Sequence, residues 1–315
     1  MGAPKRDAGE MTRRGWLLFL AVGVIWGLPY LLIRVSVREV SPALLVLLRT
    51  GGGAILLGPI AAARGQLRPV LAHWRPVLVF TLVEMGVPWF LLFHAEEKLS
   101  SSLSGLLIAA VPLVSALLAW GTGSERLDLR RVIGLLVGFG GVAALVGFAV
   151  RSDDLGSALS LGVVACGYAL GPWVLARYLS DLPAIGVIAA SLIACAVVYA
   201  PIAAIELPHR TLTGSVIGSI VGLTVVCTAA AFLLFFALIA EVGPTRATVI
   251  TYVNPAIAVL LGVTILNEHF GVATGFGFAL ILAGCLLATR RTATSATDRS
   301  STPNPTTLVP PVSEP

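Results

Sequence analysis

The sequence predicts an all-α integral membrane protein in which ten transmembrane helices form two inverted-topology five-helix repeats. Three observations support this fold: the composition, the lengths of the apolar segments and an internal repeat. Hydrophobic residues make up 57% of the chain and charged residues only 12%, and the mean hydropathy is +0.94. A water-soluble fold of 315 residues cannot bury that much apolar surface. The chain is therefore expected to lie in a lipid bilayer.

Ten apolar segments each approach the ~20 residues that a helix needs to cross a bilayer. The expected spans cover about residues 16–36, 43–63, 76–95, 101–121, 131–150, 155–177, 184–205, 215–238, 246–266 and 271–289. Basic residues precede the first segment, as they do in a secretory signal. That segment is too long for a signal and lacks a small-x-small cleavage site, so we expect it to be retained as a helix.

The two halves of the chain match each other at a constant offset of 143 residues, most clearly where the stretch 99–147 recurs. The coinciding residues are Pro112 with Pro255, Glu125 with Glu268, Gly134 with Gly277, Gly141 with Gly284, Pro29 with Pro172 and Arg34 with Arg177. Composition alone does not produce so many matches at one offset, so the chain is predicted to contain two copies of one unit.

The domain organisation follows from this repeat. We expect a first five-helix repeat over residues 16–150 and a second over 155–290. Residues 1–15 form an N-terminal arm, and residues 292–315, rich in Ser, Thr and Pro, are expected to be a disordered tail.

The distribution of basic residues predicts the orientation in the membrane. If the N-terminus is cytoplasmic, 15 of the 21 Lys and Arg residues fall on the cytoplasmic side, which satisfies the positive-inside rule. Both termini are then cytoplasmic, in a multi-pass protein of the cytoplasmic membrane. Because five spans is an odd number, the second repeat enters from the opposite side. Inverted repeats of this kind are typical of secondary transporters, whose substrate site lies near the midplane where the halves meet.

Several function classes are disfavoured. The net charge is +5, but the basic residues lie in short runs between apolar segments, so no nucleic-acid partner is expected. The four cysteines lie singly in apolar segments without paired spacing, so neither a disulfide framework nor a zinc or other metal site is indicated. The chain has no P-loop, HExxH motif or nucleophile elbow, and no repeated pore-lining charges. We therefore expect no enzyme, although a membrane-embedded enzyme or a non-transporting multispan protein remains the alternative.

Two charged residues lie well inside predicted spans: Arg49 in the second and Glu84 in the third. A charge at the bilayer centre costs about 2.5–3.5 kcal/mol on insertion scales, so such residues face the protein interior and mark functional sites. Their expected depths differ by only about 5 Å. One interpretation is substrate contact, with Glu84 also coupling transport to protons. The other is a fixed ion pair that locks the first half together.

Pro112 and Pro255 lie inside the fourth and ninth spans, where each removes a backbone hydrogen bond and permits a kink. Kinked helices that line a central cavity are one interpretation, and kinks that serve only packing are the other.

Aromatic and polar residues at similar depth can bind a small, partly apolar solute. The strongest candidates are Tyr30, Tyr252, Asn254 and Trp173, from a wider group that includes Trp26, Trp89 and Tyr168. Asn254 stands out because it is polar and adjoins a proline. The alternative roles are core packing and the aromatic belt at the membrane interface. His94 is expected to be solvated, and Glu125 and Glu268 to cap or pair in loops.

The doubled motif P-x12-E-x8-G-x6-G, which begins at Pro112 and Pro255, resembles the drug/metabolite transporter superfamily and specifically its EamA family. The Trp26-Gly27 pair and the run over residues 228–267 resemble that family's first and eighth-to-ninth helices. The resemblance implies a monomeric or weakly dimeric carrier, usually bacterial, that moves amino acids, related metabolites or toxic organic compounds, often outward. The expected function is alternating-access transport of a small organic metabolite, coupled to protons, with no cofactor.

Overall fold

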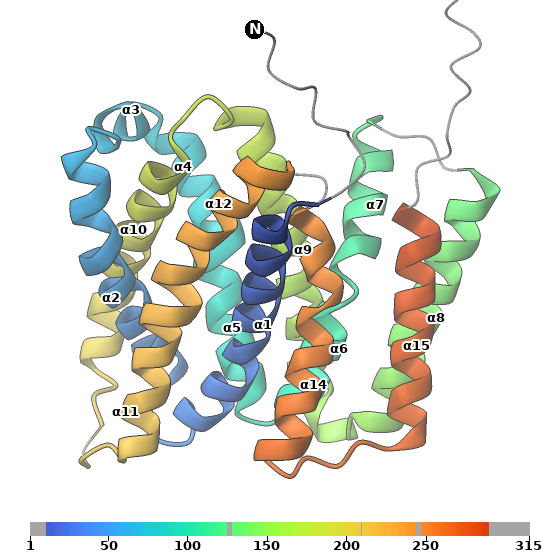
Figure 1. Cartoon of the computed structure of the whole chain (residues 1–315). Coiled ribbons are helices and arrows are strands. Elements are labelled where there is room, and N and C mark those ends of the chain that lie inside the picture. Colours follow the sequence, from blue (N-terminus) through green and yellow to red (C-terminus); the bar gives the residue numbers. More distant parts are fainter. Residues whose placement is uncertain (1–10, 125–127, 209, 244–246, 290–315) are drawn as a thin grey trace, which may run out of the picture.

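Apolar helices that run up and down the bundle account for nearly all of the computed structural model (Figure 1). It describes residues 11–124, 128–208, 210–243 and 247–289. Within these residues, nine helices are long and apolar enough to cross a membrane, and a shorter apolar helix, Ile250–Ile265, occupies the place of the ninth predicted span. Most of the N-terminal arm, the tail and Glu125 lie outside the described residues.

The first five predicted spans correspond to helices separated by short turns. Their bounds are α1 Arg13–Ser36, α2 Pro42–Ala63, α3 Leu67–Ala72, α4 Trp74–Thr81, η1 Leu82–Gly86, α5 Val87–Glu96, α6 Ser101–Ile108, α7 Val111–Gly121 and α8 Leu129–Ala149. Side-chain caps explain several of the starts: the hydroxyl of Thr12 accepts from Gly15 N at 2.9 Å, and Ser41 and Ser100 cap α2 and α6 in the same way.

The second half repeats this pattern. Its elements are η2 Ser152–Asp154, α9 Leu155–Tyr178, α10 Ala184–Ala204, α11 Gly214–Val221, η3 Gly222–Ala230, α12 Ala231–Val242, η4 Thr248–Tyr252, α14 Asn254–Ile265 and α15 Val272–Thr289.

Wide π-helical turns interrupt the third and eighth spans, at η1 and η3. Adding the 143-residue offset to the bounds of η1 gives 225–229, which lies inside η3. Two side chains satisfy carbonyls in these turns: the Tyr199 hydroxyl donates to Gly86 O at 2.9 Å, and the Thr228 hydroxyl donates to Leu223 O at 2.8 Å. π-Turns occur frequently at functional sites, so this symmetric pair directs attention to the third and eighth spans.

Each predicted kink proline follows a break in its span. Pro112 lies in the first turn of α7, after α6 has ended at Ile108, and Pro255 lies in the first turn of α14, after the 3-10 turn η4. Near the first break, the Cys285 thiol contacts Ala109 O at 3.4 Å. The breaks explain why the ninth span is a short helix rather than one continuous helix over 246–266.

The pattern of helix packing stays the same when the two repeats are exchanged. α8 packs most extensively on α15, and α2 on α10, so two pairs of equivalent helices meet each other. α1 packs on α14 and α12, and its equivalent α9 packs on α6, α7 and α5. The two repeats are therefore related by a pseudo-two-fold axis.

Glycine contacts show that this axis inverts the repeats. A Cβ added to Gly134 of α8 would lie 2.9 Å from Gly284 O of α15, and one on Gly141 would lie 2.8 Å from Gly277 O. Residue numbers rise along one helix as they fall along the other, so these equivalent helices are antiparallel. Small residues permit this close backbone contact, as expected for helices packed in lipid. The predicted inverted topology is confirmed, and α1 begins at the same end of the bundle at which α15 ends (Figure 1).

Candidate functional site

Arg49 is held at the interface of the two repeats. Its side chain lies on α2 and the residue is 6% exposed. Nε donates a hydrogen bond to the Thr228 hydroxyl of η3 at 2.9 Å, and the guanidinium carbon lies 3.7 Å from the ring centroid of Trp89 on α5. A buried cation over an indole face is a favourable cation–π contact. The second repeat thus supplies a direct partner to a charge of the first.

Local sequence explains how Thr228 reaches Arg49. Because the Thr228 hydroxyl donates to Leu223 O within η3, its lone pairs are free to accept from Arg49. The glycines that follow Arg49 allow η3 to approach α2 closely: a Cβ on Gly52 would lie 2.5 Å from the Thr224 methyl group. The run TGGG in the second span is therefore a contact surface for the eighth.

Glu84 lies on η1, and its carboxylate faces α9. A Cβ added to Gly171 would overlap that carboxylate, so Glu84 is seated directly against the backbone of α9. Its Oε2 is buried and has no hydrogen-bond partner among the described residues. No ion pair between Arg49 and Glu84 occurs among the described residues, so they do not form the fixed pair that was one of the sequence interpretations. Arg49 instead turns toward Trp89 and Thr228.

Two tyrosines lie near these charged groups. Tyr168 of α9 lies within electrostatic range of both Arg49 and Glu84 and beside Trp89. Tyr30 of α1 is 7% exposed and lies within electrostatic range of Arg49. We define the central polar cluster as Tyr30, Arg49, Glu84, Trp89, Tyr168 and Thr228. Both repeats contribute to it, through the first, second and third spans and through the sixth and eighth.

Two other predicted site residues lie outside the cluster. The Tyr252 hydroxyl lies 3.1 Å from that of Thr289, near the end of α15. With the Asn254 amide oriented to donate, its nitrogen lies 3.1 Å from Gly23 O on α1 and 3.0 Å from Ile250 O. In this conformation Asn254 ties α1 to the kinked ninth span.

Trp173 also points away from the cluster. Its ring packs edge-on against Tyr178, with centroids 6.1 Å apart. Five residues along a helix rotate a side chain by about 140°, so Trp173 and Tyr168 lie on different faces of α9. Whether Pro112 and Pro255 line a transport cavity stays a prediction.

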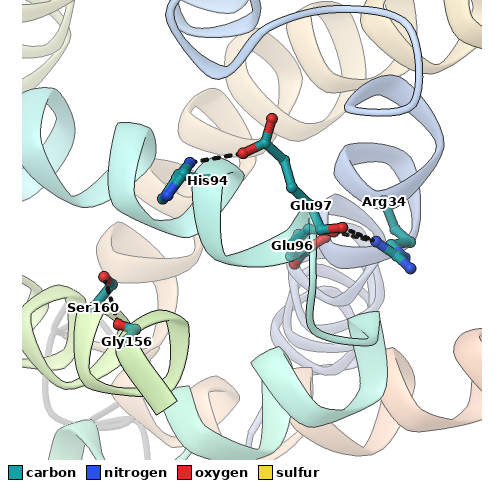
Figure 2. A network of polar contacts seen from close by, with 6 residues as sticks. All are labelled: Arg34, His94, Glu96, Glu97, Gly156 and Ser160. Carbon is teal, nitrogen blue, oxygen red and sulfur yellow. Dashed lines mark hydrogen bonds and ion pairs between the residues drawn. The ribbon is translucent and has the colours of Figure 1, made fainter. Parts of the chain in front are cut away.

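A second polar group lies at the end of the bundle remote from the start of α1. Figure 2 shows Arg34 of α1 reaching the turn after α5, where Nη1 donates to the backbone oxygens of Glu96 and Glu97, the latter at 3.0 Å. Glu97 pairs with His94 at 2.7 Å. Glu96 is fully buried, and neither carboxylate oxygen has a partner among the described residues.

Glu268 caps α6 from across the repeat interface. Oε1 accepts from Ser101 N at 2.7 Å, and Oε2 accepts from Ser102 N at 2.9 Å and from the Ser102 hydroxyl at 2.5 Å. A carboxylate at a helix N-terminus satisfies free N–H groups and complements the helix dipole. The capping role expected of Glu268 is confirmed.

Sequence analysis did not single out Thr228 or Glu96. The 143-residue offset carries Glu84 onto Cys227, the neighbour of Thr228, so the repeat itself contained a signal for this turn of the eighth span. Glu96 was missed because the third span was expected to end at residue 95, whereas α5 ends at Glu96.

An inverted pair of five-helix repeats with a polar cluster at their interface is typical of membrane transporters. The EamA-like transporter family matches residues 13–147 and again residues 156–290. The chain belongs to this family, within the drug/metabolite transporter superfamily, whose members are transporters and not enzymes.

Similar proteins cover the chain almost completely. It is 25% identical to the uncharacterized transporter YvbV of Bacillus subtilis over 90% of this chain and 94% of that protein. It is 26% identical to the uncharacterized inner membrane transporter YedA of Escherichia coli K12, over 85% and 88% respectively. A solved crystal structure shares the fold, with a TM-score of 0.62 and 24% identity over 87% of this chain and 96% of the other.

Proposed function

We propose that the protein exports a small organic metabolite, such as an amino acid, a related compound or a drug-like solute, across the cytoplasmic membrane by alternating access. The observation that carries this proposal is the central polar cluster, in which Arg49 of one repeat hydrogen-bonds Thr228 of the other. Buried charges in spans are costly and mark substrate pathways. A site built from both repeats can open to either side of the membrane when one repeat rocks against the other.

Coupling to protons is assigned to Glu84. Its carboxyl can bind and release a proton during the cycle, and its Oε2 has no partner among the described residues that would hold it in one state. Tyr168 lies within electrostatic range of Glu84 and of Arg49. We assign the coupling between Glu84 and the proposed substrate site to Tyr168.

The orientation proposed for the chain places both termini in the cytoplasm. The distribution of Lys and Arg residues supports this orientation. The Glu268 cap on α6 then lies on the outer side and ties the two repeats together there. We propose that the carrier works as a monomer or a weak homodimer.

Transport by purified protein in liposomes is the decisive experiment. Vesicles are loaded with amino acids, nucleosides, polyamines, organic acids or cationic drugs, and efflux is measured with and without an inward proton gradient. Export of one class, accelerated by the gradient and absent from empty vesicles, is the expected result. Failure to move any class under either condition would overturn the proposal.

A further inference from the structure

We infer that the transported solute carries a carboxylate group, which Arg49 binds through its two terminal nitrogens. This inference rests on the proposed function and names the chemical class of its substrate. The evidence comes from the charge of Arg49, the geometry of its remaining donors and the groups that surround it.

The charge of Arg49 has no anionic partner. Arg49 is the one Lys or Arg residue buried within the part of the chain that the structure describes. No described carboxylate forms an ion pair with it. A cation buried without an anion is strongly unfavourable, whereas a bound anion compensates its charge. Thr228 and Trp89 supply a dipole and a ring face, and neither supplies a negative charge.

The free edge of the guanidinium group matches a carboxylate. The Thr228 hydroxyl accepts the hydrogen bond from Nε, and the Trp89 ring covers one face of the guanidinium group. The terminal nitrogens make no hydrogen bond to the described residues. Neither nitrogen is fully buried, so both keep accessible surface. Two parallel N–H groups on that edge bind the two oxygens of a carboxylate end-on.

The surroundings favour one negative charge over two. A phosphate monoester carries about −1.5 to −2 at pH 7, whereas a carboxylate carries −1 and matches the single cation. The hydroxyls of Tyr30 and Tyr168 lie within electrostatic range of Arg49. The rings of Trp89 and the tyrosines suit an apolar remainder.

Ligand-dependent thermal stability of the full-length, detergent-purified protein tests this inference. The probes are acetate, hexanoate, phenylacetate and L-phenylalanine, each paired with its carboxamide, together with phenyl phosphate. We expect at least one carboxylate to raise the melting temperature at a concentration where its amide has no effect. Arg49→Gln should weaken that carboxylate at least tenfold. Arg75→Gln is a matched control, because Arg75 also lies over an indole, that of Trp74, but at the start of α4.

A second variant keeps the test informative if Arg49→Gln does not fold. Thr228→Val keeps the Arg49 charge but removes the hydrogen bond to its Nε. It should weaken carboxylate binding several-fold, because the terminal N–H groups of Arg49 are then no longer held in place. Carboxylates that bind no better than their amides, or equally well to Arg49→Gln, would overturn the inference. Liposome efflux separates the two proposals. Export of amines or amides with no response to carboxylates refutes the carboxylate assignment alone, whereas no export of any class refutes the transport function itself.

Discussion

Thr228 of the second repeat accepts a hydrogen bond from Nε of Arg49 of the first repeat at 2.9 Å, although the two residues are 179 positions apart in the sequence. Their contact fixes the one buried arginine of the described residues at the interface of the repeats. It also joins the second span to the π-turn of the eighth.

Replacing Thr228 with valine should therefore destabilise the protein. The change keeps the side-chain shape but leaves the Arg49 Nε without its partner and removes the hydroxyl that donates to Leu223 O, which costs about 1–3 kcal/mol. Thermal unfolding in detergent measures the effect. Thr224→Val is the matched control: it is a buried threonine in the same turn that makes no such contacts, and it should change stability by less than about 0.5 kcal/mol. Equal losses for both variants would show that the Arg49 hydrogen bond contributes nothing.

Glu84→Gln should separate coupling from binding. Glutamine keeps the size of the side chain but cannot carry the proton, so efflux driven by a proton gradient should fall at least tenfold. Exchange of labelled for unlabelled solute, which needs no net proton movement, should remain measurable. Parallel liposome assays of efflux and exchange check this. Glu97→Gln, at an exposed carboxylate paired with His94, serves as the control. Equal loss of both activities would assign Glu84 to the structure of the site rather than to coupling.

Gly284→Ala should loosen the contact between α8 and α15. A Cβ at this position would overlap the Gly138 backbone and lie 2.6 Å from Gly134 O, so the helices would have to separate. Overpacking of this kind costs about 1–3 kcal/mol. Gly140→Ala on α8 is the control, because nothing lies within 4 Å of a Cβ there. The test compares the melting temperatures of the two variants in one detergent. A Gly284→Ala protein as stable as the control would contradict the packing described.

The fold was predictable because a bilayer restricts both the length and the composition of every helix. The repeat offset then related Gly134 to Gly277 and indicated the inversion before any contact was known. The ninth span was less regular than predicted, since Pro255 and the turn η4 shorten it. Hydropathy reports which segments lie in lipid but not which helices become neighbours.

The site was predictable only in part, because the sequence does not show which helices become neighbours. Arg49 and Glu84 were found because charges are rare inside spans. Their partners were not, because which residues meet depends on how each helix is rotated about its axis. A rotation of about 140° about the helix axis separates Tyr168, which faces the cluster, from Trp173, which does not.

Glu268→Ala should weaken the contact between the repeats at the remote end of the bundle. It removes three hydrogen bonds to Ser101 and Ser102 and leaves the first N–H groups of α6 without a cap. Loss of a helix cap costs about 0.5–2 kcal/mol. Since these bonds also join the repeats, the variant should open more readily at that end. Labelling of an introduced Ser101→Cys, whose side-chain hydroxyl has no hydrogen-bond partner among the described residues, by a water-soluble maleimide measures the opening, in the presence and absence of Glu268→Ala. Glu206→Ala at an exposed helix end is the control. Unchanged labelling would show that Glu268 acts only as a local cap.

Glu96→Gln should make the protein more stable. Glu96 is fully buried, and neither carboxylate oxygen has a hydrogen-bond partner among the described residues, so the wild-type side chain bears a desolvation cost that no hydrogen bond offsets there. The charge of Arg34 offsets only part of this cost, because its hydrogen bonds go to the backbone oxygens of Glu96 and Glu97 rather than to the carboxylate. Glutamine keeps the volume and removes the negative charge, and we expect a rise in melting temperature that corresponds to about 1–3 kcal/mol. A residue that destabilises its own fold persists when function needs it, so the stabilised variant should export more slowly. A fall in melting temperature would instead mean that the Glu96 carboxylate has a stabilising partner in the membrane.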